Sequence, residues 1–274
     1  KPRVYYRKNA GAYFSSPGVL TSGTALNGTW TFTILASDMG GLVISDVISY
    51  LVIAQDVAGT VHIGSNPALG LVATDVNTVT TPPTAPNSYV INATLAGTYT
   101  VGAAGAYTTL TAAVAAYNTS CISGAVIFSL TDATYPSETF PITINANTTA
   151  SAVNTLTIQP ATGVTASITG TSTTGMIVMS GADYVTINGS NTSTVNSVCP
   201  LVAATRNLTV INTSATTTSA VIWLATTAGL DAVTNCSVQN CILKGNAPTT
   251  TIIGLGVGGA VIGNAGTSNN NISF

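Results

Sequence analysis

The sequence predicts an all-β protein, and three observations carry that prediction. Of the 274 residues, 46% are hydrophobic and only 5% are charged, whereas about 25% are charged in an ordinary soluble protein. Short runs alternate an apolar residue with Thr or Ser, which is the period-two pattern of a half-buried strand. This pattern recurs throughout the second half of the chain. A chain of this length can bury one large core or two ordinary ones.

The scarcity of charge excludes several classes of protein. Six Lys and Arg and eight Asp and Glu residues give a formal net charge of −2. We expect no nucleic-acid partner, because such proteins need a basic face to displace counterions. We also expect no membrane span, because the apolar segment 41–58 is interrupted by Asp46 and Asp56 and the apolar segment 252–262 is short and glycine-rich.

Residues 1–79 are predicted to form a β-sandwich of the immunoglobulin or fibronectin type. Strand patterns at 4–6, 29–34, 47–54 and 61–63 are separated by turns that contain Gly, Ser or Pro. The Cys, Trp, Cys spacing of antibody domains does not occur here. Because the sequence begins directly in a strand pattern, we expect this domain to be truncated at its start.

A proline-rich segment, 80–87, is predicted to be an extended linker to a second domain at 88–274. The one helical pattern of that domain spans 108–117, where Leu110, Val114 and Tyr117 have helical spacing among alanines. An apolar strand pattern follows at 124–128. All later segments have the patterns of strands and turns.

An internal repeat of unequal intervals follows the helix. Each copy has an apolar residue, Ser or Thr, and a second apolar residue, usually preceded by Asn. The copies lie at 183–188, 206–211, 234–239 and 270–274. Strands in fixed register joined by loops of variable length are typical of stacked coils, so the sequence predicts a right-handed parallel β-helix. We expect the predicted helix to cap the first coil of the β-helix. We also expect the outward Ser and Thr side chains to form a ladder of hydroxyl groups, and the last coil to be truncated at Phe274.

Two sets of residues resemble known modules. Residues 106–114 (AYTTLTAAV), 124–130 (GAVIFSL) and 181–190 (GADYVTINGS) resemble the pectate-lyase-like β-helix modules of very large secreted proteins of the Bacteroidetes. Residues 4–11, 28–34 and 50–56 resemble the immunoglobulin-like modules that precede them. The resemblance implies a secreted cell-surface adhesin, similar to the mobile adhesins of gliding motility and exported by the type IX system. It implies an extracellular surface or a polysaccharide as partner, together with the secretion or motility machinery of the outer membrane.

Folds of the pectate-lyase type also include enzymes, so catalysis has to be judged from the residues. Alignment of the repeats puts Asp183 and Arg206 at equivalent positions of adjacent coils. They would form either the acid–base pair of a polysaccharide lyase or an ion pair that fixes the register. No second carboxylate aligns with Asp183, although a glycosidase needs two. We therefore predict no enzymatic activity, with Asp183 and Arg206 as the catalytic residues if the protein is an enzyme.

Few other residues are candidates for binding. Tyr107 and Tyr135 could stack on sugar rings, and Asp56 and Asp75 could bind calcium; no other metal or cofactor is expected. Glu138 is predicted to be a solvated loop residue. The glycine-rich run 254–259 lacks the context of a phosphate-binding loop and is predicted to be a tight turn.

The cysteines leave two interpretations open. The four residues are Cys121, Cys199, Cys236 and Cys241. If all are oxidised, three pairings are open; otherwise they are thiols packed as small apolar groups. Zinc-ligand spacing does not occur, since His62 is the one histidine.

Three hypotheses about function remain. The favoured one is a structural and adhesive module, a rigid stalk or rod on a cell surface. The others are a carbohydrate-binding module and a polysaccharide lyase or glycosidase. Because no signal peptide is visible, we expect the chain to be a segment of a longer secreted protein. The ligand and the length of that protein are left open by the sequence.

Overall fold

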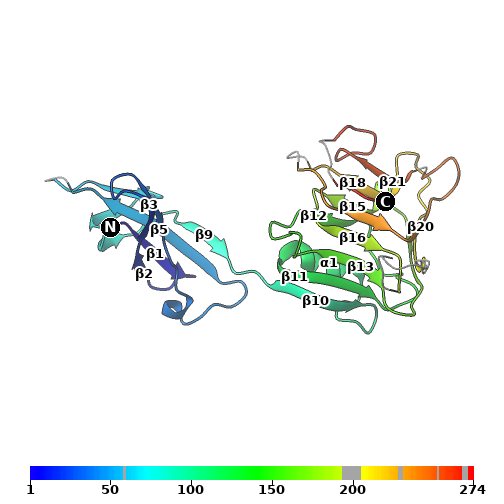
Figure 1. Cartoon of the computed structure of the whole chain (residues 1–274), viewed down its shortest axis with the longest axis horizontal. Coiled ribbons are helices and arrows are strands. Elements are labelled where there is room, and N and C mark those ends of the chain that lie inside the picture. Colours follow the sequence, from blue (N-terminus) through cyan, green and yellow to red (C-terminus); the bar gives the residue numbers. More distant parts are fainter. Residues whose placement is uncertain (58–59, 193–204, 228–230, 252, 267–270) are drawn as a thin grey trace. The chain divides into compact units, whose positions relative to one another are not determined.

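The computed structural model describes residues 1–57, 60–192, 205–227, 231–251, 253–266 and 271–274. Regular structure in these residues is mostly β, with one α-helix and one short 3₁₀ helix, which confirms the predicted all-β class. The chain divides into two compact units, Lys1–Asn92 and Ala93–Phe274 (Figure 1). Within the described residues, no helix combines the length and apolar character needed to span a bilayer.

The N-terminal unit contains one five-stranded antiparallel sheet and two hairpins. The sheet has the order β2-β1-β5-β6, with β9 also pairing with β5; the hairpins are β3–β4 and β7–β8. The elements are β1 (Arg3–Lys8), β2 (Phe14–Pro17), β3 (Val19–Gly23), β4 (Gly28–Thr31), the 3₁₀ helix (Ala36–Met39), β5 (Val47–Gln55), β6 (Ile63–Asn66), β7 (Val72–Asp75), β8 (Thr78–Thr81) and β9 (Asn87–Val90).

Both faces of this sheet are apolar. Successive side chains of a strand point to opposite faces, so Val4 and Tyr6 pack in one cluster with Ile48. Tyr5 and Leu51 pack in a second cluster on the opposite face, together with residues of the β7–β8 hairpin. The central strands β1 and β5 are therefore covered on both sides.

The predicted linker at 80–87 is wrong in its position, because the boundary between the units falls between Asn92 and Ala93. The strand β9 pairs antiparallel with β5, from Tyr50 opposite Asn87 to Val47 opposite Val90. A proline removes only its own backbone donor, so the residues that follow Pro86 remain free to join the sheet.

The C-terminal unit is built from three parallel sheets. Sheet 1 has the order β10-β11-β13-β16-β19, sheet 2 the order β14-β17-β20, and sheet 3 the order β12-β15-β18-β21. The elements are β10 (Thr94–Val101), α1 (Leu110–Thr119), β11 (Cys121–Leu130), β12 (Ile142–Asn145), β13 (Leu156–Pro160), β14 (Ala166–Gly170), β15 (Gly175–Ser180), β16 (Val185–Asn188), β17 (Leu208–Asn212), β18 (Ala220–Ala225), β19 (Ser237–Gln239), β20 (Cys241–Lys244) and β21 (Ile253–Gly258).

From β13 onward the chain visits the three sheets in a constant order. One circuit is β13–β14–β15, the next is β16–β17–β18, and the third is β19–β20–β21. Each strand pairs in parallel with the equivalent strand of the previous circuit (Figure 1). Inward side chains of successive circuits lie in register: Phe128 pairs with Ile158, and Ile158 with Ile187. All three are fully buried in one continuous core.

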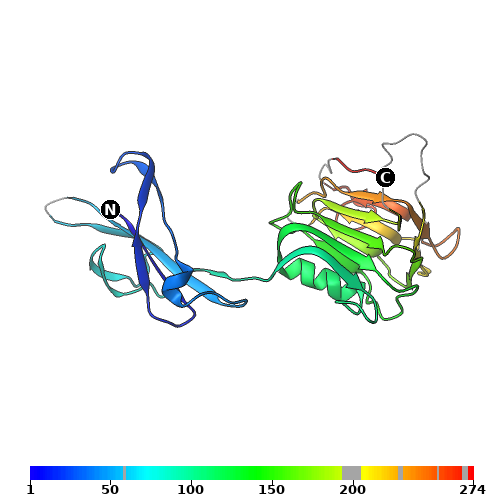
Figure 2. The same ribbon diagram turned by 60° about the horizontal axis from the view of Figure 1, so that its bottom comes forward.

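The helix α1 lies against the first strands of this unit (Figure 2). The side chain of Thr109 accepts a hydrogen bond from the backbone N–H of Ala112 at 3.0 Å and so caps the helix. The buried face of α1 consists of Leu110, Ala113, Val114 and Tyr117, which belong to the same core as the strands.

The repeated segments do not all belong to one sheet, which corrects the alignment made from sequence. Residues 185–188, 237–239 and Ser273 lie in or beside sheet 1, whereas Leu208–Asn212 is β17 of sheet 2. In both β16 of sheet 1 and β17 of sheet 2, buried apolar residues alternate with a partly exposed Thr. The alternating pattern therefore identifies a strand but not the sheet to which it belongs.

Candidate functional site

The outer face of sheet 1 has a column of hydroxyl groups. Thr157, Thr186 and Ser237 are paired in register on neighbouring strands. They alternate with buried apolar residues and therefore point outward. The Oγ of Ser237 donates a hydrogen bond to Oγ1 of Thr186 at 3.1 Å. Neighbouring strands repeat about every 4.8 Å, so the hydroxyl groups form a regular row.

A second column lies beside the first and consists mainly of amides. Ser129 pairs with Gln159, and Asn188 on β16 pairs with Gln239 on β19. The amide Nδ2 of Asn240 donates to Oδ1 of Asn188 at 2.9 Å, which holds this amide in place. We call the two columns together the polar face, which consists of Ser129, Thr157, Gln159, Thr186, Asn188, Ser237 and Gln239.

The polar face has no formal charge. The strands of sheet 1 contain no Lys, Arg, Asp or Glu. Hydroxyl and amide groups each donate and accept hydrogen bonds. A ligand rich in hydroxyl groups can therefore exchange its hydrogen bonds with water for bonds to this face without desolvating a charge.

The structure does not bring Asp183 and Arg206 together. The predicted pair is therefore wrong, both as the acid–base pair of a lyase and as an ion pair that fixes the register. Asp183 forms an isolated parallel bridge with Thr234. Its Oδ1 accepts hydrogen bonds from the backbone N–H of Thr234, at 3.0 Å, and from the Thr234 hydroxyl. Arg206 precedes β17 of sheet 2 and lines a small surface pocket with Gln239 and Asn240. The register of the circuits places Thr234, rather than Arg206, beside Asp183.

Of the two candidate tyrosines, Tyr135 is unavailable for stacking on a sugar. It is only 4% exposed. Its hydroxyl donates to the carbonyl of Val101 at 2.8 Å and accepts from the N–H of Asp132 at 3.1 Å. Burial raises the pKa of Tyr135 to about 12. The prediction for this residue is therefore wrong.

Tyr107 is half-buried at the α1 end of the core. Its ring centroid lies 5.8 Å from those of both Tyr99 and Phe128. Burial, and to a smaller extent Tyr99, raise the pKa of Tyr107. Part of the ring remains exposed, so sugar stacking at Tyr107 stays a prediction.

The candidate calcium ligands are each engaged by groups of their own loops. The carboxylate of Asp56 lies 2.7 Å from Nδ1 of His62 and accepts a hydrogen bond from the His62 N–H at 3.0 Å. The carboxylate of Asp75 accepts from the N–H of Asn77 at 2.6 Å. Across the described ranges, no three His, Cys, Asp or Glu residues are grouped so that they could hold a metal ion. Calcium binding at Asp56 or Asp75 stays a prediction.

Glu138 has a role that the sequence did not reveal. Its carboxylate accepts hydrogen bonds from the backbone N–H groups of Leu110 and Thr111, at 2.6 and 2.7 Å, and from the Thr111 hydroxyl. It therefore binds the first turn of α1 instead of being solvated. No local pattern could have indicated this contact, because Glu138 follows the helix by a complete strand.

The thiols within the described part of the chain are not joined to one another. Cys121, Cys236 and Cys241 are free, which excludes pairings among these three; Cys236 is buried, whereas Cys121 and Cys241 are only partly buried. Burial raises the pKa of Cys236 and of Cys241 to about 11. Cys199 lies outside the described residues.

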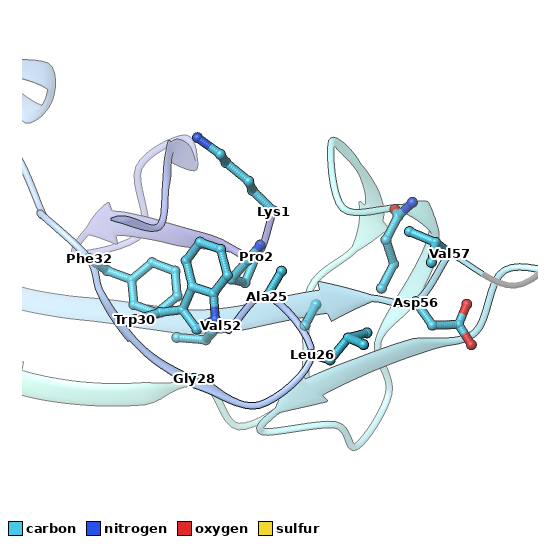
Figure 3. Close-up of a pocket in the computed structure, with 12 residues that line it drawn as sticks. Lys1, Pro2, Ala25, Leu26, Gly28, Trp30, Phe32, Val52, Asp56 and Val57 are labelled. Atoms are coloured by element: carbon cyan, nitrogen blue, oxygen red, sulfur yellow. The ribbon is translucent and has the colours of Figure 1, made fainter. Parts of the chain in front are cut away.

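A groove of about 640 Å³ lies in the N-terminal unit, between the β3–β4 hairpin and β5 (Figure 3). Trp30 and Phe32 come from one side, and Val52 comes from the central sheet. Leu26 lies at the tip of the hairpin and is 92% exposed. The groove is mainly apolar, which distinguishes it from the polar face.

The chain thus contains two surface features of different chemistry, an uncharged polar face in one unit and an apolar groove in the other. Comparison of the chain with protein-family models, with curated proteins and with solved structures finds no match.

Proposed function

We propose that the chain is a structural and adhesive module of a secreted cell-surface protein, and that its polar face binds neutral polysaccharide. The observation that carries this proposal is the pair of in-register, uncharged columns on sheet 1. Many hydroxyl and amide groups at a fixed spacing can each form a weak hydrogen bond with a long sugar chain. Adhesion then results from the number of bonds, and no deep pocket is required.

We propose a right-handed parallel β-helix for the C-terminal unit and an immunoglobulin-like module for the N-terminal unit. The constant order in which the chain visits three parallel sheets supports the β-helix. A continuous core joins the circuits, and a close-packed core gives the unit the low compressibility that a stalk requires. For the N-terminal unit, the support is an antiparallel sheet with hairpins over its faces.

The cellular setting is proposed from the resemblance of residues 106–114, 124–130 and 181–190 to modules of Bacteroidetes adhesins. The proposed localisation is the cell surface after export by the type IX system. The proposed partners are an extracellular polysaccharide surface and the outer-membrane machinery of secretion or motility. The small number of charged residues is compatible with such an exposed position, because the outward hydroxyl groups of the parallel sheets form hydrogen bonds with water.

Catalysis receives no support from the described residues, so no second function is proposed. A lyase would need a base close to an acid, but the Asp183 carboxylate is engaged by Thr234. Arg206 belongs to the segment that leads into sheet 2.

The test is to incubate the purified chain with insoluble neutral polysaccharides and to measure both protein depletion and new sugar ends. We expect saturable depletion without new ends, and about tenfold weaker binding of Thr186→Glu, which puts a charge on the polar face. The matched control is Thr209→Glu, which has the same half-buried outward position on sheet 2. An equal loss in both variants, or no depletion by any polysaccharide, would contradict the proposal. New ends that disappear in Asp183→Asn would establish the enzymatic hypothesis instead.

A further inference from the structure

The hairpin beside the apolar groove has a free strand edge. In the part of the chain that the structure describes, β4 pairs with β3 alone. Three of its four residues, Gly28, Thr29 and Thr31, are exposed. An edge strand of this kind presents backbone N–H and C=O groups that can pair with another extended segment.

The groove bordered by this edge has the period of a β-strand. Trp30 and Phe32 are two residues apart, both line the groove, and Figure 3 shows their rings side by side. Val52 and Ala54, also two residues apart on β5, line the facing wall. An extended peptide places alternate side chains on one side with this spacing.

The rim of the groove carries exposed apolar groups. Leu26 is 92% exposed and Val57 is 93% exposed, and both line the groove. The charged groups that line it are Lys1 and Asp56; in Figure 3, Asp56 lies far from the Trp30 and Phe32 rings, and the amine of Lys1 points away from them. The central part therefore suits an uncharged segment.

We propose that this groove binds an extended, uncharged segment of another polypeptide. The segment pairs with the free edge of β4 and inserts alternate apolar side chains between Trp30 and Val52. Binding of this kind combines main-chain hydrogen bonds, which give affinity, with pockets for alternate side chains, which give specificity. The inference does not depend on the polar face or on polysaccharide binding.

The experiment uses the whole chain and a synthetic peptide probe with the core Thr-Val-Thr-Val-Thr-Val-Thr, flanked by lysines for solubility. Titration calorimetry is expected to show one-to-one binding. A second peptide with proline in place of the central valine is expected to bind about tenfold more weakly or not at all, because proline cannot donate to the edge of β4.

Matched variants locate the site without altering a buried residue. Leu26→Asp is expected to weaken binding about tenfold, since it brings a charge to the apolar rim. Leu69→Asp, at a position that is 77% exposed in the same unit and outside the groove, is expected to bind like the unaltered chain. Equal binding of the two peptides, or equal binding by the two variants, would overturn the proposal. Self-association abolished by Leu26→Asp, without peptide binding, would also overturn it, because the occupant would then be a second copy.

Discussion

Glu138 connects the first turn of α1 to the loop before β12. The N–H groups at a helix N-terminus have no partners within the helix and carry a partial positive charge. The Glu138 carboxylate accepts from two of them, while Thr109 accepts from a third. One carboxylate thus fixes the helix at the end of the parallel stack.

This contact predicts a measurable loss of stability in Glu138→Gln. The variant keeps the size of the side chain but removes its charge, so we expect the free energy of unfolding of the C-terminal unit to fall by about 1–2 kcal/mol. Urea denaturation followed by circular dichroism measures the change. Ser137→Ala, at an exposed neighbouring position, serves as the control. Equal stability of Glu138→Gln and the unaltered chain would show that the contact contributes nothing.

The thiols of Cys236, which is buried, and Cys241, which is partly buried, predict a loss of stability at high pH. Cys236 and Cys241 ionise near their ordinary pKa of 9 when unfolded but near 11 when folded, because burial opposes the thiolate. The unfolded chain therefore loses these protons first. The stabilising contribution is complete below pH 9 and is lost as the pH rises towards 11, with a slope of about 1.4 kcal/mol per pH unit for each thiol.

Unfolding measured under reducing conditions between pH 8 and 11 tests this expectation. The variant with both Cys236→Ala and Cys241→Ala should lose less stability over the window than the unaltered chain. The thiols would have no such role if the two pH profiles were parallel.

At the scale of elements, the glycine-rich run 254–259 belongs to the strand β21 as far as Gly258 and is not the predicted turn. Gly256 and Gly258 belong to β21, which pairs in parallel with β18. The ring of Trp223 occupies the space that their side chains would take, and its Nε1 donates to the carbonyl of Gly259 at 3.1 Å. Glycine is needed in this strand because a tryptophan from the neighbouring strand lies over it.

Gly256→Ala is therefore expected to destabilise the C-terminal unit by about 1–3 kcal/mol. The added Cβ would lie 2.5 Å from Cζ3 of Trp223, so the ring would have to move. Gly254→Ala is the matched control in the same strand, because its Cβ would meet only Leu243, at 3.9 Å. Denaturation midpoints of the two variants provide the comparison. A midpoint for Gly256→Ala as high as that of the control would mean that Trp223 moves without cost.

For the whole molecule, the separate cores of the two units predict separate unfolding. The N-terminal clusters contain Ile48, and the C-terminal core contains Ile158; both residues are fully buried. Units with their own cores can fold alone. The described C-terminal residues form the larger core, and a larger core favours a higher transition temperature.

Scanning calorimetry of the whole chain is expected to show two transitions. Ile48→Ala should lower only one of them and Ile158→Ala only the other, each through a loss of about 2–5 kcal/mol in its own unit. A single transition that both variants shift would mean that the units unfold together.

The sequence by itself determined the local features of this protein. Alternation of apolar and hydroxyl residues specifies half-buried strands, and the spacing of Leu110, Val114 and Tyr117 specifies one helix, because both depend on neighbours within a few residues. The low content of charged residues also follows from the sequence, and with it the uncharged outer surface of sheet 1. The alternation in 183–188 therefore identifies Thr186 as an outward residue without any knowledge of the neighbouring strands.

Only the tertiary structure decided which strands are neighbours. Paired residues are 51 positions apart for Thr186 and Ser237 but 42 apart for Ala166 and Leu208. Loops of variable length leave the hydrophobic period of each strand unchanged, so the pattern does not show how many residues separate two paired strands. That is why Asp183 meets Thr234 instead of Arg206, and why Glu138 reaches a helix that precedes it. Such contacts arise from packing between segments that are distant in the sequence, and the local alternation of residues contains no information about that packing.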